Sequence, residues 1–217
     1  MRGEYNLKKA EMNQKKGHTL IVVAIFIVIA VSVFFTGCIE EKKLHDGTKV
    51  NADVIQIKDF SVKSVSSGLN TSAKGTIFIK GAEGISENVQ IVALVEIDPN
   101  DWGGVVFDIP KGWQITGIKS SYPENMTSAS PEDYISTWTT ADPDYEWSAM
   151  IEVGRDRSYT QTKGGNGTVV IDLVRTDALN QPDTAGVLIA VGSDEKNGVK
   201  ISGTDYIEIP LSSTGSG

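Results

Sequence analysis

Apolar and polar residues alternate along most of the chain after residue 50, as they do in β-strands with one buried face. The stretch 89–97 is apolar at most positions of both faces, which is typical of a strand covered on both sides. The other runs are short, rich in Val, Ile, Thr and aromatic residues, and separated by Gly, Asn, Asp or Pro; they lie at 54–57, 76–79, 105–109, 113–118, 134–138, 147–153, 168–175, 187–191 and 206–209.

No stretch after residue 40 has the 3.6-residue repeat of an amphipathic helix. About ten short strands without helices predict an all-β sandwich or barrel, and we expect an antiparallel β-sandwich of immunoglobulin-like or jelly-roll-like type. Glycine-rich residues 163–167 predict a hairpin turn into the strand at 168–175, and residues 195–198 predict another before 199–202. Residues 119–133 are expected to form an exposed loop.

The N-terminal segment has a different pattern. Residues 20–35 are apolar except for Ser32, they follow a lysine-containing stretch, and Thr36 and Gly37 separate them from Cys38, the only cysteine. A basic stretch, an apolar run and small residues before a cut point form a secretory signal. With cysteine as the first residue after the cut, the segment resembles the signal of prokaryotic lipoproteins.

This resemblance implies that Cys38 is lipidated and becomes the first residue of a mature protein held at the cell membrane. Two alternatives stay open, an uncleaved hydrophobic helix over residues 19–39 and a freely secreted domain. Lysines before the apolar run place the N-terminus in the cytoplasm and the rest outside it. We therefore expect an anchor at 1–38, a polar tether at 39–49, an extracytoplasmic domain at 50–211 and a disordered tail at 212–217.

Charge narrows the range of partners. Of the 20 Lys and Arg residues, 5 precede Cys38, as do 2 of the 28 Asp and Glu residues, so the remainder carries a net charge of −11. A polyanionic domain does not favour nucleic acid as a partner, although it does favour solubility and cations.

Aromatic residues gather in the central third of the chain. Candidate ligand-binding residues are Trp102, Trp113, Trp138, Trp147 and Tyr145, since aromatic faces stack on sugar rings. The alternative for the three tryptophans inside predicted strands is that they fill the core. Trp102 follows a turn and is the tryptophan that we expect to be most exposed.

Two Asp- and Pro-containing turns raise the question of a metal site. If they met at one end of the sandwich, Asp98, Asp101, Asp142 and Asp144 would be candidate ligands of calcium, which prefers oxygen. The alternative is that these residues serve ordinary β-turns. Calcium is the only cofactor that the sequence suggests.

Catalytic residues are not expected, and we do not expect an enzyme. After Cys38 the only histidine is His45, in the tether, so a Ser–His–Asp arrangement is excluded from the domain.

Asn70, Asn125 and Asn166 begin glycosylation triplets. Residues 88–118, in which a long apolar strand is followed by a Gly- and Val-rich stretch over 103–110, are loosely similar to cohesin and carbohydrate-binding sandwiches, and no site residue is carried over.

These observations favour a tethered binding module for a glycan or another surface protein. The alternative is a structural or assembly protein of the cell envelope without a small ligand, and a small hydrolase is a third option. Exposure of Trp102 and Trp138 on one face would favour the binding module. Buried tryptophans with an exposed, uncharged edge strand would favour assembly.

Overall fold

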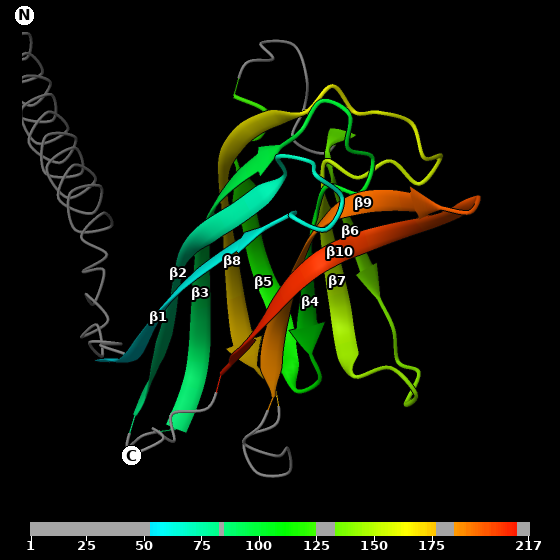
Figure 1. The fold of residues 1–217 in the computed structure, drawn as a ribbon. Coiled ribbons are helices and arrows are strands. Elements are labelled where there is room, and N and C mark those ends of the chain that lie inside the picture. The colour runs from blue at the N-terminus through cyan, green and yellow to red at the C-terminus, as the bar shows by residue number, and fades with distance from the viewer. Residues whose placement is uncertain (1–52, 83–84, 125–132, 177–184, 212–217) are drawn as a thin grey trace, which may run out of the picture. The chain divides into compact units, whose positions relative to one another are not determined.

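The computed structural model describes residues 53–82, 85–124, 133–176 and 185–211, all within one compact unit, Asn51–Gly217 (Figure 1). The predicted signal, Cys38, the tether and the tail at 212–217 lie outside the described residues. Within the described ranges, no helix has the length and apolar character needed to cross a membrane.

In the described ranges, ten strands form two antiparallel sheets of five, which confirms the predicted all-β architecture with two packed sheets. Sheet A has the order β1-β2-β3-β8-β5 and sheet B the order β10-β9-β4-β7-β6. The strands span Asp53–Lys63 (β1), Ser72–Ala82 (β2), Ile85–Ile97 (β3), Val105–Pro110 (β4), Trp113–Ser120 (β5), Ile135–Thr139 (β6), Trp147–Val153 (β7), Gly165–Arg175 (β8), Gly186–Lys196 (β9) and Val199–Pro210 (β10).

Alternation along the strands builds the core between the sheets. Ile77, Ile91 and Ile171 are fully buried on sheet A, and Phe107 and Ile189 are fully buried on sheet B. Each of these residues is followed by one that points away from the core, so the period-two pattern predicted from the sequence sets the inner and outer faces of both sheets.

The chain changes sheet five times, and this determines which strands become neighbours. The turn at Asn197 and Gly198, both with positive φ, joins β9 to β10 as the predicted hairpin. The other predicted hairpin, at 163–167, is wrong. Lys163 and Gly164 do have positive φ, but they end a connection from β7 in sheet B to β8 in sheet A, so the strands on either side do not pair.

Edge strands β1 and β10 are joined along one side of the sandwich. The Lys58 ammonium donates to the carbonyl of Pro210 at 2.6 Å. The carboxylate of Asp205 accepts backbone N–H bonds from Val65 and Ser66, each at 3.0 Å. These bonds fix the far edge of sheet B against sheet A and leave the outer face of sheet B as a separate surface.

Candidate functional site

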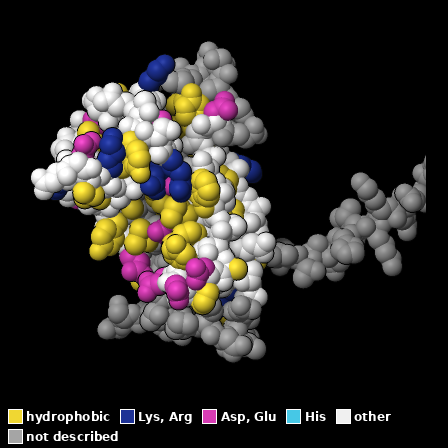
Figure 2. Space-filling view, turned by 90° about the vertical axis from the view of Figure 1, so that its right-hand side faces the viewer, with side chains coloured by type: hydrophobic (Ala, Val, Ile, Leu, Met, Phe, Trp, Pro, Cys, Tyr) yellow, Lys and Arg dark blue, Asp and Glu magenta, His cyan; other side chains and the backbone are white. Residues whose placement is uncertain are grey.

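The outer face of sheet B combines apolar, aromatic and charged side chains. On β4, Val105, Phe107 and Ile109 belong to the core, so Val106 and Asp108 point outward. Figure 2 looks onto the side of the molecule on which sheet B lies; hydrophobic side chains gather in its middle, with basic groups above them and acidic groups below. This mixture of apolar, basic and acidic groups makes the outer face of sheet B the candidate surface for a site.

A groove of about 610 Å³ lies at the end of this face where β4 ends and β7 begins. Its lining includes Asp108 and Pro110 of β4, Tyr145 and Trp147, Leu188 of β9 and Glu208 of β10. We call it the sheet B groove. The volume is within the range of ordinary ligand sites, about 300–1,000 Å³. Two aromatic rings and several carboxylates therefore share one concave surface.

The two aromatic rings of the groove lie close together at an angle. The ring centroids of Tyr145 and Trp147 are 5.1 Å apart and their planes are tilted by 51°. Tyr145 is 49% exposed, whereas Trp147 is half-buried. Lys111 also lines the groove, and its ammonium donates to the carbonyl of Pro143 at 2.7 Å, which holds the 143–147 segment against the end of β4.

Asp108 is a half-buried acid of the groove. It lies between Met150 of β7 and Leu188 of β9 in the register of sheet B. Burial raises the pKa of Asp108 to about 6; the nearby Arg155 opposes this shift, and Glu152 adds to it. Among the described residues its Oδ1 atom has no hydrogen-bond partner, although the atom is buried. A buried acceptor without a partner is costly to the fold.

A second group of charged residues lies further along β7. Glu152, only 2% exposed, accepts bonds from Arg155 Nη1 at 2.7 Å and from Arg157 Nη2 at 2.8 Å. The indole N–H of Trp138 donates to its other oxygen at 2.8 Å. The Arg157 guanidinium lies 4.0 Å from the centre of the Trp138 ring. We call these four residues the Glu152 cluster.

The structure separates the predicted aromatic residues into buried and accessible ones. Trp113 is 6% exposed and belongs to the core. Trp102, expected to be the most exposed, is 8% exposed, because Tyr159 packs edge-on against it at 4.9 Å. Trp138 is 45% exposed at the edge of sheet B, and only Trp147 and Tyr145 line the sheet B groove.

Asp98 and Asp101 serve the turn after β3. Asp101 is fully buried; its carboxylate accepts bonds from the Thr71 hydroxyl, from Ser193 Oγ at 2.5 Å and from the N–H of Gly103 at 2.8 Å. Backbone N–H bonds, first from Asn100 and then from Asn70, hold the pKa of Asp98 below its usual value. This arrangement agrees with turn chemistry, since protein donors already occupy these oxygens.

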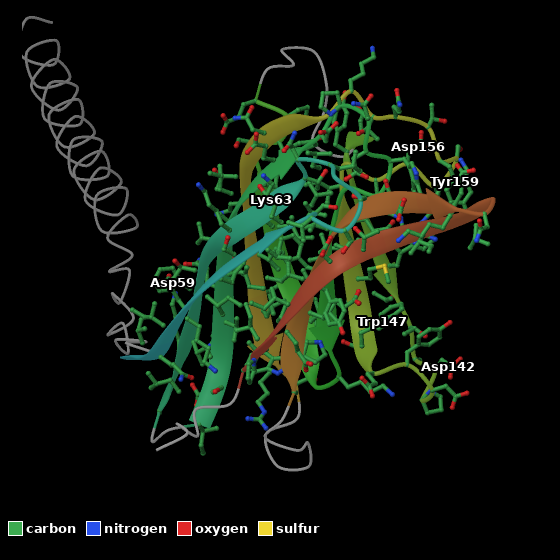
Figure 3. All side chains as sticks on the ribbon, viewed as in Figure 1. Asp59, Lys63, Asp142, Trp147, Asp156 and Tyr159 are labelled. Atoms are coloured by element: carbon green, nitrogen blue, oxygen red, sulfur yellow. The ribbon has the colours of Figure 1, made fainter. Side chains whose placement is uncertain are left out.

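The two Asp-containing turns do not meet. In the register of β4 and β7, Val105 pairs with Val153 and Pro110 with Trp147, so the turns lie at opposite ends, roughly 17 Å apart along the strand. Figure 3 shows Asp142 and Trp147 toward one end and Asp156, whose N–H donates to the carbonyl of Trp102, toward the other. The backbone N–H of Asp144 donates to Asp142.

The four-ligand calcium hypothesis required both turns to lie at one end of the sandwich, and the geometry does not meet that condition. The described residues contain no group of three or more His, Cys, Asp or Glu side chains placed to hold a metal ion. Of the glycosylation candidates, Asn70 is exposed in a loop, Asn166 is exposed but lies within β8 rather than in a loop, and Asn125 lies outside the described residues.

Asp108, Glu152 and Glu208 were not among the site residues predicted from the sequence. A usable signal was present for two of them. Asp108 is the only charged residue of β4, and Glu152 is the only charged residue of β7. A single carboxylate in an otherwise apolar strand needs a partner or a function, because burying an unpaired charge is costly.

Comparisons with known proteins leave the function open. No protein-family model matches the chain, and no curated protein matches it. A solved structure described as "pH-induced modulation of Streptococcus parasanguinis adhesion by Fap1 fimbriae" is similar with a TM-score of 0.29 and 11% identity, over 71% of this chain and 95% of that one. A similarity of this size supports no conclusion about what the present chain binds.

Proposed function

We propose that the protein is a membrane-tethered, extracytoplasmic β-sandwich that acts as a binding module and takes its ligand in the sheet B groove. The ligand is a glycan or a segment of another surface protein. The observation that carries this proposal is the groove itself, where Tyr145 and Trp147 share a concave surface with Asp108 and Glu208. Aromatic rings with a few polar groups around them are the usual lining of ligand sites.

The tethering part of the proposal rests on the sequence before the domain. The apolar run at 20–35 followed by Cys38 resembles a prokaryotic lipoprotein signal. A single acyl chain binds membranes only marginally, and lipoproteins of the resembled kind carry several chains. The domain would then present the sheet B groove to the outside of the cell.

A matched pair of tyrosine variants tests the binding site. Tyr145 is 49% exposed in the groove, whereas Tyr206 of β10 is 67% exposed and is not among the residues that line it. In the full chain in nanodiscs, we expect Tyr145→Ala to weaken binding about tenfold and Tyr206→Ala less than about twofold. The measurement is the change in tryptophan fluorescence on titration with a panel of oligosaccharides and peptides. Equal effects of the two variants, or no saturable response, would contradict the proposal.

A structural or assembly role is the second candidate, and β6 favours it. This strand, Ile135–Thr139, lies at the edge of sheet B, has no charged residue and is exposed at four of its five positions. Uncharged edge strands can pair with another chain. Sedimentation velocity separates the candidates, because assembly through β6 predicts concentration-dependent oligomers, whereas the binding module is compatible with a monomer.

A further inference from the structure

We propose that the sheet B groove binds the lysine or arginine side chains of a basic segment in a partner protein. This inference rests on the proposed function and adds the chemistry of its ligand.

The charge of the groove is negative. Asp108, Glu146 and Glu208 line it together with one cation, Lys111, which leaves a net charge of −2 when all three acids are ionised. The Lys111 ammonium is engaged with the carbonyl of Pro143 and forms no ion pair with the three acids in the described part of the chain. A concave surface of one charge attracts ligands of the opposite charge.

The acids of the groove have no ion-pair partner within the described part of the domain. Arg155 and Arg157 pair with Glu152 instead. The segments of Asn51–Gly217 that the structure does not describe (51–52, 83–84, 125–132, 177–184 and 212–217) contain no Lys, Arg or His in their sequence. No ion pair among the described residues therefore neutralises the three acids, although Arg155 acts on Asp108 through its charge.

The Glu152 cluster shows how this face of sheet B holds a cation. The guanidinium of Arg157 lies over the ring of Trp138 while it bonds to a buried carboxylate. An aromatic face and a carboxylate together stabilise a cation more than either does alone. The groove has the same two kinds of group, Trp147 with Tyr145 and Asp108 with Glu208, but without an arginine of its own.

The shape of the aromatic pair favours a side chain over a sugar ring. Tyr145 and Trp147 are tilted by 51°, so they do not form one flat platform for a pyranose ring. A compact ammonium or guanidinium group can lie against the exposed ring of Tyr145, and its apolar stem can lie along Leu188 and Pro110. The carboxylates of half-buried Asp108 and exposed Glu208 line the groove as acceptors for such a donor.

The test uses two glutamates that change the charge equally. Glu208 and Glu96 are both exposed strand residues, but Glu208 lines the groove and Glu96 lies on β3 of sheet A. The full chain in phosphatidylcholine nanodiscs is titrated with acetylated, amidated hexalysine at 0.15 M salt, where exposed charges beyond about 8 Å are screened. We expect Glu208→Gln to weaken binding about fivefold and Glu96→Gln less than about twofold.

Two further probes separate the outcomes. Hexaglutamate should not bind. Neutral cellohexaose or chitohexaose should bind at least tenfold more weakly than hexalysine, and a tenfold ratio of Kd corresponds to about 1.4 kcal/mol. Equal weakening by Glu208→Gln and Glu96→Gln would overturn the cationic ligand. A neutral oligosaccharide that binds more tightly, with an affinity lowered by Tyr145→Ala, would overturn it while leaving the binding module intact. If no probe depends on Tyr145 or Glu208, both proposals fail.

Discussion

Two regions of the outer face of sheet B use the same kinds of side chain in different ways. In the Glu152 cluster, two arginines and an indole N–H surround one buried carboxylate, so the protein itself supplies the partners. In the sheet B groove, carboxylates and aromatic rings are present without an ion-pair partner in the described residues. The first arrangement stabilises the fold. In our proposal the second serves a ligand, and the difference between the two regions can be tested by changing one region at a time.

The largest expected effect on stability comes from removing the central carboxylate of the Glu152 cluster. Glu152→Gln leaves the guanidinium of Arg155, 18% exposed, without its counter-charge. Breaking one partner of a buried ion pair is strongly destabilising, so we expect the free energy of unfolding to fall by about 3 kcal/mol. The measurement is equilibrium unfolding in urea.

Glu146→Gln is the matched control for this experiment in the groove. Glu146 is exposed and forms no ion pair among the described residues, so the same change should alter stability by less than about 0.5 kcal/mol. Equal losses for the two variants would mean that the Glu152 cluster is not the stabilising region of this face.

The next largest effect is the pH dependence that Asp108 gives to the stability of the fold. Burial raises its pKa to about 6 in the folded protein, above the ordinary value of 3.8, with Arg155 opposing and Glu152 reinforcing the shift. Between these two pH values the folded state binds more protons than the unfolded state, so stability falls as the pH rises from about 4 to about 6. The cost remains at higher pH, where the buried carboxyl is ionised.

Asp108→Asn should remove this part of the pH dependence. Because the carboxyl is only partly buried, solvent screening reduces the gain, and we expect the variant to be more stable than the parent by about 1 kcal/mol at pH 8 and equal to it at pH 4. The melting temperatures of both proteins are compared between pH 4 and pH 8. The difference in melting temperature between the two proteins at each pH cancels the pH dependence that other groups near Asp108, including Glu152, Arg155 and Glu208, give to both. Parallel curves would contradict the assignment.

The sequence predicted the strands well and their partners poorly. Alternation identifies β4 and β7 because it depends only on neighbouring residues. It does not show that β4 pairs with β9, which brings Asp108 beside Leu188 although the two are eighty residues apart in the sequence. The turn at Lys163 and Gly164 illustrates the same limit, since positive φ reverses the chain whether or not the flanking strands pair.

The candidate site was predicted only in part for a similar reason. Tyr145 and Trp147 could be named from the sequence, because aromatic residues are conspicuous beside a Pro-containing turn. The burial of Trp102 depends on Tyr159, which reaches it from the connection between β7 and β8. Glu208 enters the groove only because β10 lies next to β9. Contacts between distant segments decided both results, and local patterns contain no information on them.

The smallest effect tests whether the two regions are separate. The indole N–H of Trp138 donates to Glu152 at 2.8 Å, and Trp138→Phe removes this donor but keeps an aromatic ring beneath Arg157. The two arginines still bond to Glu152, so we expect a loss of about 1 kcal/mol in urea unfolding, less than that caused by Glu152→Gln.

The same variant should leave the groove unchanged, because Trp138 does not line it. Hexalysine affinity of Trp138→Phe should stay within about twofold of the parent, as expected for a site without shared partners. A loss as large as that of Tyr145→Ala would show that Trp138, Tyr145 and Trp147 form one continuous ligand surface. The Glu152 cluster would then be part of the binding site, and a ligand would contact or displace one of its arginines. The Glu152 cluster and the sheet B groove would no longer be separate regions.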